Sequence, residues 1–100
     1  SLIDIPIQVL VTPIEYKLSN NYPNPFNNTT TIDFQISAAD YVKLSIYNMI
    51  GEEVLIVVDE IKEPGKHRVS LNDNDLSSGV YLYRLKVGNF ESAKKMILLK

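Results

Sequence analysis

Residue types that commonly carry out catalysis or bind metals are scarce in this chain. Its 100 residues include no cysteine and a single histidine, His67, which excludes thiolate catalysis and metal sites built from several thiolates or imidazoles. His67 alternates in phase with Val69 and Leu71, a pattern typical of a packed strand residue rather than of a Ser/His/Asp set. We therefore expect that the chain is not an enzyme, and that it has no catalytic residue, metal or cofactor.

The acidic residues Asp73 and Asp75 are the nearest approach to a metal-binding motif. They alternate with Asn72 and Asn74, as at the start of a calcium-binding loop. Such a loop also needs a glycine and a later glutamate, and the chain continues with 76–78, Leu-Ser-Ser, instead. A turn capped by its own Asn and Asp side chains is therefore favoured.

The six tyrosines raise the alternative of a sugar-stacking platform. The chain has no tryptophan, although stacking platforms for sugars rely heavily on that residue. Tyr81 and Tyr83 share their strand phase with Leu85 and Val87. This phase predicts that both tyrosines lie in the core, with their hydroxyls reaching its rim.

Charge is distributed unevenly along the chain. Ten Lys and Arg residues against twelve Asp and Glu residues give a formal net charge of −2, so no overall positive field favours nucleic acid. The 45% hydrophobic content with 22% charged residues is typical of a soluble globular domain, and no apolar run is long enough to cross a bilayer. From residue 84 onward five basic residues face one acidic residue. Two interpretations stay open, a solvated face or a basic patch for an acidic partner. The basic residues are Arg84, Lys86, Lys94, Lys95 and Lys100.

Strands rather than helices must position these side chains. Period-two alternation predicts strands over residues 30–36, 41–47 and 67–71, and a short apolar run predicts one over 53–58. Two long strands are predicted over 80–87 and 90–99. Turns are predicted between them at Asn48-Met49-Ile50-Gly51 and at Glu63-Pro64-Gly65-Lys66, where Pro-Gly is typical of a type II turn. Gly88-Asn89 is the signal of a two-residue hairpin between the last two strands. One domain of this length and pattern predicts an all-β fold, an immunoglobulin-like antiparallel β-sandwich of about seven strands. A small β-barrel is the second candidate.

The two ends of the chain need separate interpretation. In the last strand we favour Met96 and Leu98 as inward residues, in phase with Phe90, which places Lys95 outward and Lys94 near the rim or on a bulge. Residues 1–14 alternate in part and predict a linker or an additional edge strand from an upstream region. Because the chain opens with no signal-peptide pattern, we expect that it was cut from a longer polypeptide.

Three stretches in order resemble a known family. The first is Asn21-Tyr22-Pro23-Asn24-Pro25-Phe26-Asn27, the second runs from Leu44 through Asn48 and Gly51 to Val54, and the third is Ser78-Gly79-Val80-Tyr81 followed by the closing Lys94–Lys100 segment. Over about residues 15–100 this pattern resembles the type A C-terminal sorting domain of the type IX secretion system of Bacteroidota-type bacteria. One departure is Leu71, where relatives often carry tryptophan.

The resemblance implies a non-catalytic secretion signal domain at 15–100, which the outer-membrane type IX machinery recognises in order to export and anchor an upstream cargo in the same polypeptide. The implied partners are outer-membrane secretion and shuttle proteins and a sortase-like peptidase. The product is then secreted or held at the cell surface, after passage through the periplasm and the outer membrane. The residues implied for partner binding are Gly51, Gly79, Val80, Tyr81, Lys94, Lys95 and Lys100. Those implied for a structural turn are Tyr22, Pro23, Asn24, Pro25 and Phe26.

Two other functions are compatible with the same residues. One is an accessory module that attaches a secreted hydrolase to a carbohydrate or to the cell wall. The other is a plain spacer or assembly domain, because immunoglobulin-like domains of flagellar hook-capping proteins share part of the pattern.

Overall fold

The computed structural model describes residues 15–73 and 76–100, and these residues form seven strands and no helix. The strands are β1 (Lys17–Leu18), β2 (Thr29–Ile36), β3 (Asp40–Tyr47), β4 (Glu53–Lys62), β5 (Gly65–Asn72), β6 (Gly79–Val87) and β7 (Phe90–Leu98). The linker or extra strand expected over 1–14 lies outside the described residues.

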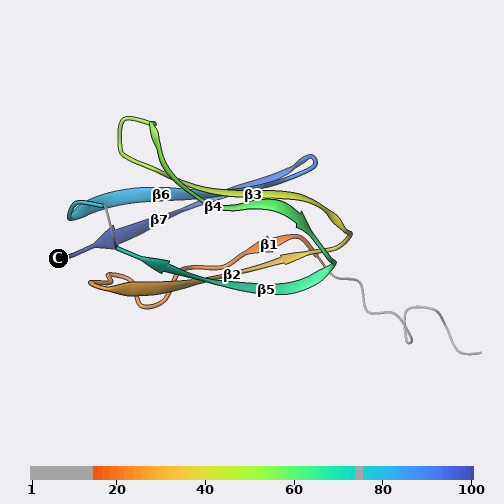
Figure 1. The fold of residues 1–100 in the computed structure, drawn as a ribbon, viewed down its shortest axis with the longest axis horizontal. Helices are drawn as coiled ribbons and strands as arrows, with labels where there is room; N and C mark the ends of the chain where they lie inside the picture. The colour runs from red at the N-terminus through yellow and green to blue at the C-terminus, as the bar shows by residue number, and fades with distance from the viewer. Residues whose placement is uncertain (1–14, 74–75) are drawn as a thin grey trace, which may run out of the picture.

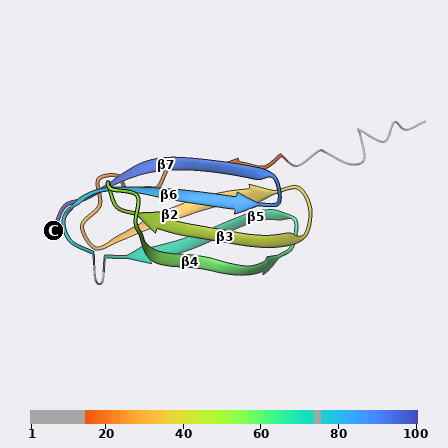
Figure 2. The ribbon, with the colours of Figure 1, turned by 90° about the horizontal axis from the view of Figure 1, so that it is seen from above.

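The strands form two separate antiparallel sheets that face each other. One sheet has the order β1-β2-β5 and the other the order β4-β3-β6-β7. Figure 1 shows the two sheets as two layers, and Figure 2 shows the four-stranded sheet from above. The predicted all-β antiparallel sandwich is confirmed, and the β-barrel alternative is wrong because the two sheets do not close into one.

Alternating side chains from both sheets fill the space between the layers. In β2 every second residue from Thr30 to Ile36 is buried, and in β6 the same holds from Tyr81 to Val87. Full burial of one large apolar side chain contributes about 1.5–3 kcal/mol, so this alternation drives the pairing of the layers. The fully buried apolar side chains are Ile32, Ile36, Val42, Leu44, Ile46, Tyr83, Leu85, Met96 and Leu98.

Two predicted strands differ in extent or environment from the expectation. The strand expected over 53–58 extends to Lys62, and it lies at the edge of its sheet with most side chains exposed. Two register shifts against β3 interrupt its pairing, a common feature of edge strands that keeps them from pairing with another chain. The turn expected over 63–66 is shorter, because β5 already begins at Gly65.

The interpretation of His67 as a packed strand residue is confirmed. Its ring stacks on Phe34 with 5.2 Å between the ring centroids. Its Nε2 lies 2.7 Å from the carbonyl oxygen of Glu63, to which it donates a hydrogen bond. The ring therefore packs over the strand and ties the β4–β5 turn to β5.

The tyrosines Tyr81 and Tyr83 lie in the core, as predicted, and the structure shows that both hydroxyl groups form hydrogen bonds. Tyr83 has no exposed surface, and its hydroxyl donates to the carbonyl oxygen of Ser19 at 2.6 Å. The hydroxyl of Tyr81 donates to the carbonyl oxygen of Ser77 at 2.7 Å. With both rings in the core, neither presents a face on which a sugar ring could stack.

Burial raises the pKa of Tyr83 from 10.0 to about 12, which predicts a loss of stability in alkali. The unfolded phenol ionises near pH 10, while the folded phenol stays neutral to about pH 12. The free energy of unfolding should therefore fall as the pH rises through this interval, by on the order of 2 kcal/mol, and then level off. Urea unfolding at several pH values measures this fall in the free energy of unfolding. Tyr83→Phe should show a smaller fall, and an unchanged fall would contradict the assignment to Tyr83.

The β6–β7 hairpin sets the phase of the last strand. Val87 pairs with Phe90 across Gly88-Asn89, and Gly88 has a φ of +57°, a left-handed conformation that suits a two-residue hairpin turn. A Cβ at Gly88 would lie 3.1 Å from Asp40 Oδ2, so the close approach also favours glycine. From this turn, regular pairing continues to Leu98 opposite Gly79.

Candidate partner-binding site

The last strand has the phase that the sequence analysis favoured. Met96 and Leu98 are fully buried, and Lys95 is exposed. Lys94 is half-buried and shares the inward phase of Met96, at the rim of the sandwich. The β6–β7 register has no irregularity, so Lys94 lies at the rim without a bulge. An inward-phase lysine on an edge strand also opposes edge-to-edge association with another sheet.

The end of β7 is held by a segment far away in the sequence. The amide of Phe26 donates to the carbonyl of Ile97 at 3.0 Å, and the amide of Leu99 donates to the carbonyl of Phe26 at 2.8 Å. Asn24 Oδ1 accepts a further bond from the Ile97 amide at 2.9 Å. We call residues Tyr22–Phe26, in this role, the clamp. The residue types of this segment predict a structural turn, but they give no sign of its pairing with β7.

The clamp is itself anchored to β2 through buried polar groups. The side-chain amide of Asn21, 3% exposed, donates to Thr30 Oγ1 at 3.0 Å and to the carbonyl of Pro23 at 3.2 Å. Thr30 donates to the same carbonyl at 2.8 Å. The peptide bonds before Pro23 and Pro25 are both cis, and the ring of Phe26 is buried with 2% exposure.

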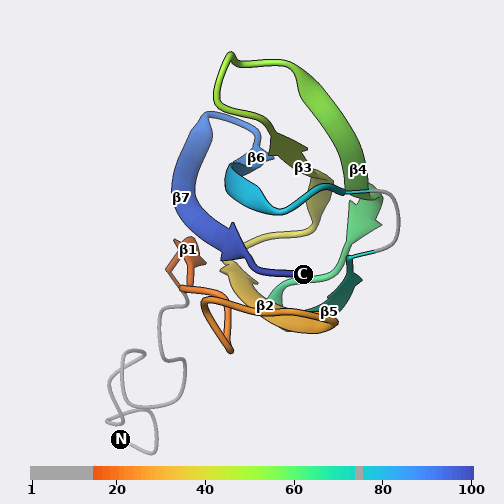
Figure 3. The ribbon, with the colours of Figure 1, turned by 90° about the vertical axis from the view of Figure 1, so that its left-hand side faces the viewer.

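The start of β6, a second segment that contains candidate residues, pairs with the end of β7 on the side opposite to the clamp. Gly79, Val80 and Tyr81 open β6 and pair with Leu98, Ile97 and Met96 in turn. The amide of Lys100 donates to Ser78 Oγ at 2.9 Å. The structure therefore brings the clamp, the start of β6 and the end of β7 together. Figure 3 looks onto this end of the sandwich.

The turn that contains Gly51 lies at the same end, and β6 separates β3, from which the turn starts, from β7. It connects β3 to β4, and β3 ends at Tyr47 opposite Leu82, near the start of β6. Figure 1 shows this loop on the same side of the molecule as the end of the chain. The candidate residues thus lie at one end of the molecule. There, the central strands β3 and β6 lie between the Gly51 turn and the end of β7.

Asn48 holds this turn in one conformation. Its side-chain oxygen accepts from the amides of Ile50 at 3.1 Å and Glu52 at 2.9 Å, and its side-chain amide donates to Glu52 Oε1 at 2.8 Å. The backbone adds a bond from Gly51 N to the carbonyl of Asn48 at 3.0 Å. Gly51 has a φ of +89°, which L side chains rarely adopt.

Replacing Gly51 by alanine is expected to lower the free energy of unfolding by about 1–2 kcal/mol. A Cβ at this position meets no atom within 4 Å, so the cost is that of the backbone conformation alone. Urea unfolding measures the change. Ile50→Ala, at a side chain that is 80% exposed, should change stability by less than about 0.5 kcal/mol. Equal effects of the two substitutions would show that the conformation of Gly51 is not what matters.

Comparison with protein families identifies the chain. The family described as secretion system C-terminal sorting domain matches residues 20–99, which include the clamp, the Gly51 turn, the start of β6 and the whole of β7. The chain belongs to this family. A comparison with curated proteins found no match. The chain is thus a type IX secretion sorting domain, and the resemblance noted in the sequence is confirmed.

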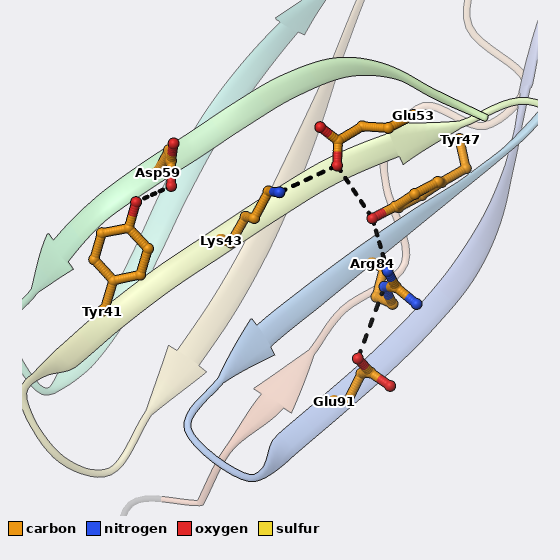
Figure 4. Close-up of polar contacts among 7 residues, drawn as sticks. All are labelled: Tyr41, Lys43, Tyr47, Glu53, Asp59, Arg84 and Glu91. Carbon is orange, nitrogen blue, oxygen red and sulfur yellow. Dashed lines mark hydrogen bonds and ion pairs between the residues drawn. The ribbon is translucent and has the colours of Figure 1, made fainter. Parts of the chain in front are cut away.

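The five basic residues from residue 84 onward fall into two groups. On the outer face of the four-stranded sheet, Arg84 stacks over Tyr47 with its guanidinium carbon 4.7 Å from the ring centroid, and it donates to the Tyr47 hydroxyl at 2.8 Å. Its Nε lies 3.8 Å from Glu91. Figure 4 shows this network, which continues from Tyr47 to Glu53 and Lys43. The second group, Lys86, Lys94, Lys95 and Lys100, forms no ion pair with residues 15–73 or 76–100.

The three-stranded sheet carries an ion pair on its outer face. Arg68 Nε lies 2.9 Å from Asp33 Oδ1, and the Tyr22 hydroxyl donates to Asp33 Oδ2 at 2.9 Å. These bonds, that of Arg68 above all, lower the pKa of the Asp33 carboxyl. The contact ties the clamp residue Tyr22 to β2 and β5. We assign it a structural role.

Other chemical sites are not found in the part of the sorting domain that the structure describes. No group of three or more His, Cys, Asp or Glu side chains there could hold a metal ion. No helix among those residues is long and apolar enough to cross a membrane. The family itself is a non-catalytic sorting signal family.

Proposed function

We propose that the sorting domain exports and anchors its cargo by presenting the end of β7 as a rigid, basic surface to outer-membrane secretion and shuttle proteins. Lys94, Lys95 and Lys100 supply the charge in this proposal. Gly79, Val80 and Tyr81 supply the neighbouring strand, and the Gly51 turn lies at the same end of the molecule. The observation that carries the proposal is the clamp, which holds the final residues of the chain against the sandwich.

Rigidity at this end favours recognition of a folded signal. A loose tail would lose conformational entropy on binding, whereas a strand held on both sides has already lost it during folding. The lysines add electrostatic attraction, which speeds association with an acidic partner and selects against a basic one. The proposed partner surface therefore carries carboxylates spaced along an extended strand.

The proposed sequence of events begins in the periplasm, where the folded domain and its upstream cargo meet the machinery. The complex then crosses the outer membrane. A sortase-like peptidase separates the cargo from the domain, and the cargo is released or anchored at the cell surface. The domain supplies binding energy and position in this scheme, and it takes no part in the covalent step.

Fusion of the chain to a reporter tests this function. A reporter with a periplasmic signal peptide should reach the medium or the cell surface of a type IX-competent bacterium only when residues 1–100 follow it. The reporter alone should stay in the periplasm, as should the fusion in a strain that lacks the outer-membrane translocon. Equal export with and without the domain would contradict the proposal. Affinity electrophoresis in insoluble glycans provides the comparison with a carbohydrate module, since the sorting domain should migrate unretarded.

A further inference from the structure

Exposed apolar side chains gather at the β3–β4 turn and the first half of β4. Ile50 is 80% exposed and Met49 is 65% exposed. Val54 and Leu55 follow on β4 with 40% and 37% exposure. We call these four residues the apolar corner. Single exposed apolar residues are common on protein surfaces, whereas several exposed apolar residues within one short segment are typical of an interaction site.

The apolar corner is held rigidly although it projects into solvent. The three hydrogen bonds of the Asn48 side chain and the left-handed Gly51 define one conformation for the turn. A residue that serves only as a surface turn has no need to be apolar, and Met and Ile are costly there because their surface stays in water. A preorganised turn that presents such side chains loses little entropy when a partner covers it.

A hollow of about 290 Å³ lies directly beside these side chains. Val54 and Leu55 form one wall, and Leu76 and Tyr81 are among the residues opposite. Among residues 15–73 and 76–100, those that line the hollow are uncharged. The hollow is large enough for one apolar side chain of a partner, and it joins the Gly51 turn to the start of β6 through Tyr81.

The charge around the apolar corner selects the kind of partner. Glu52 stands between Ile50 and β4, and the hydrogen bond that its Oε1 accepts comes from the neutral amide of Asn48. Glu53 already pairs with Lys43 at 3.2 Å. The rim is therefore anionic, which opposes an anionic lipid surface and suits a protein surface with a lysine or arginine beside an apolar pocket.

We propose that the apolar corner is a docking surface for a protein of the export machinery, which receives Met49 and Ile50 in an apolar pocket, inserts an apolar side chain into the hollow and places a cation beside Glu52. This inference rests on the proposed function, because the partner belongs to the same machinery. It adds a second contact, apolar and anionic at its rim, to the basic contact at the end of β7.

The test uses the reporter fusion with the full chain. Met49→Ser/Ile50→Ser should lower the exported fraction at least about tenfold, because loss of an interface anchor of 1.4 kcal/mol already weakens binding tenfold. The matched control is Tyr41→Ser/Ile61→Ser, which alters side chains with 50% and 70% exposure at the opposite end of the β3–β4 pair. The control should be exported as well as the wild type, and thermal unfolding should show both variants folded.

The outcomes separate this inference from the proposed function. A wild-type fusion that stays in the periplasm contradicts the proposed function itself. Normal export of the wild type together with normal export of Met49→Ser/Ile50→Ser overturns the docking surface alone. A photo-reactive residue at position 50, but not at position 61, should cross-link to a component of the translocon in intact cells. Flotation of the wild-type domain, but not of Met49→Ser/Ile50→Ser, with phosphatidylglycerol vesicles would assign the corner to lipid and overturn the protein partner.

Discussion

Replacing Phe26 by alanine is expected to lower the free energy of unfolding by about 3–5 kcal/mol, the range found when a buried aromatic ring is removed. The ring is 2% exposed, and its backbone pairs with both Ile97 and Leu99. The cavity left by the ring should loosen the clamp and with it the end of β7. Urea unfolding followed by circular dichroism measures the loss.

The same variant has a local signature that separates the clamp from general core packing. The amide of Leu99, which donates to the Phe26 carbonyl, should exchange its hydrogen faster in Phe26→Ala than the amides of the central strand β3. The control beside the same segment is Asn27→Ala, at an exposed side chain, where the cost should stay below about 0.5 kcal/mol. A loss below about 1 kcal/mol for Phe26→Ala would show that the clamp does not stabilise the domain.

Removal of residues 94–100 is expected to abolish the cooperative folding transition and export together. Met96 and Leu98 have no exposed surface, and loss of each large core side chain costs about 2–5 kcal/mol. Their sum approaches the 5–15 kcal/mol that stabilises a typical domain. The truncation would also uncover Tyr81 and Tyr83 on β6. Thermal unfolding by circular dichroism measures the folded state, and the reporter fusion measures export.

Truncation alone therefore does not separate folding from recognition. Lys94→Gln/Lys95→Gln/Lys100→Gln provides the control, because it removes charge from half-buried and exposed positions without altering the buried residues. This variant should retain a cooperative transition within about 1 kcal/mol of the wild type. A truncated chain that still unfolds cooperatively would contradict the account of β7 as part of the core.

Much of the fold follows from local patterns that the sequence displays. Alternation and apolar runs predicted six strands near their observed positions, because strands such as β2 and β6 bury one face against the opposite sheet. The phase of β7 was predicted although four consecutive residues at 96–99 are apolar. The reason is that Gly88-Asn89 makes a two-residue turn, which fixes Phe90 opposite Val87 and so determines every later position.

Contacts between segments that are distant in the sequence could not be predicted from local patterns. The Asn24 side chain meets the Ile97 amide across 73 positions of the sequence, and no residue near either end signals this partner. The exposure of β4 was missed for a related reason. An apolar run at 54–58 suits a buried strand as well as an edge strand, and only the sheet order decides between them.

In the candidate site, too, some features could be predicted from neighbouring residues and others depend on the three-dimensional structure. The phase of Lys95 and the turn at Gly51 were predicted from residue types, since each depends on neighbours in the sequence. The arrangement of the start of β6 between β3 and β7 depends on the topology of the sheet. The hydrogen bonds by which Asn48 holds its turn could be recognised only from the positions of its side-chain atoms in the structure.

The most direct measurement is the exported fraction of a reporter fused to the chain with Lys95→Glu/Lys100→Glu, set against the fusion with Lys17→Glu/Lys66→Glu. The two variants change the net charge equally, and all four lysines are exposed. Lys95 lies on β7 and Lys100 just after it, whereas Lys17 and Lys66 lie on the three-stranded sheet. The account predicts a loss of export of about tenfold or more for the first variant and normal export for the second, with both domains folded. Equal export of both variants would contradict the claim that the machinery recognises the basic end of β7.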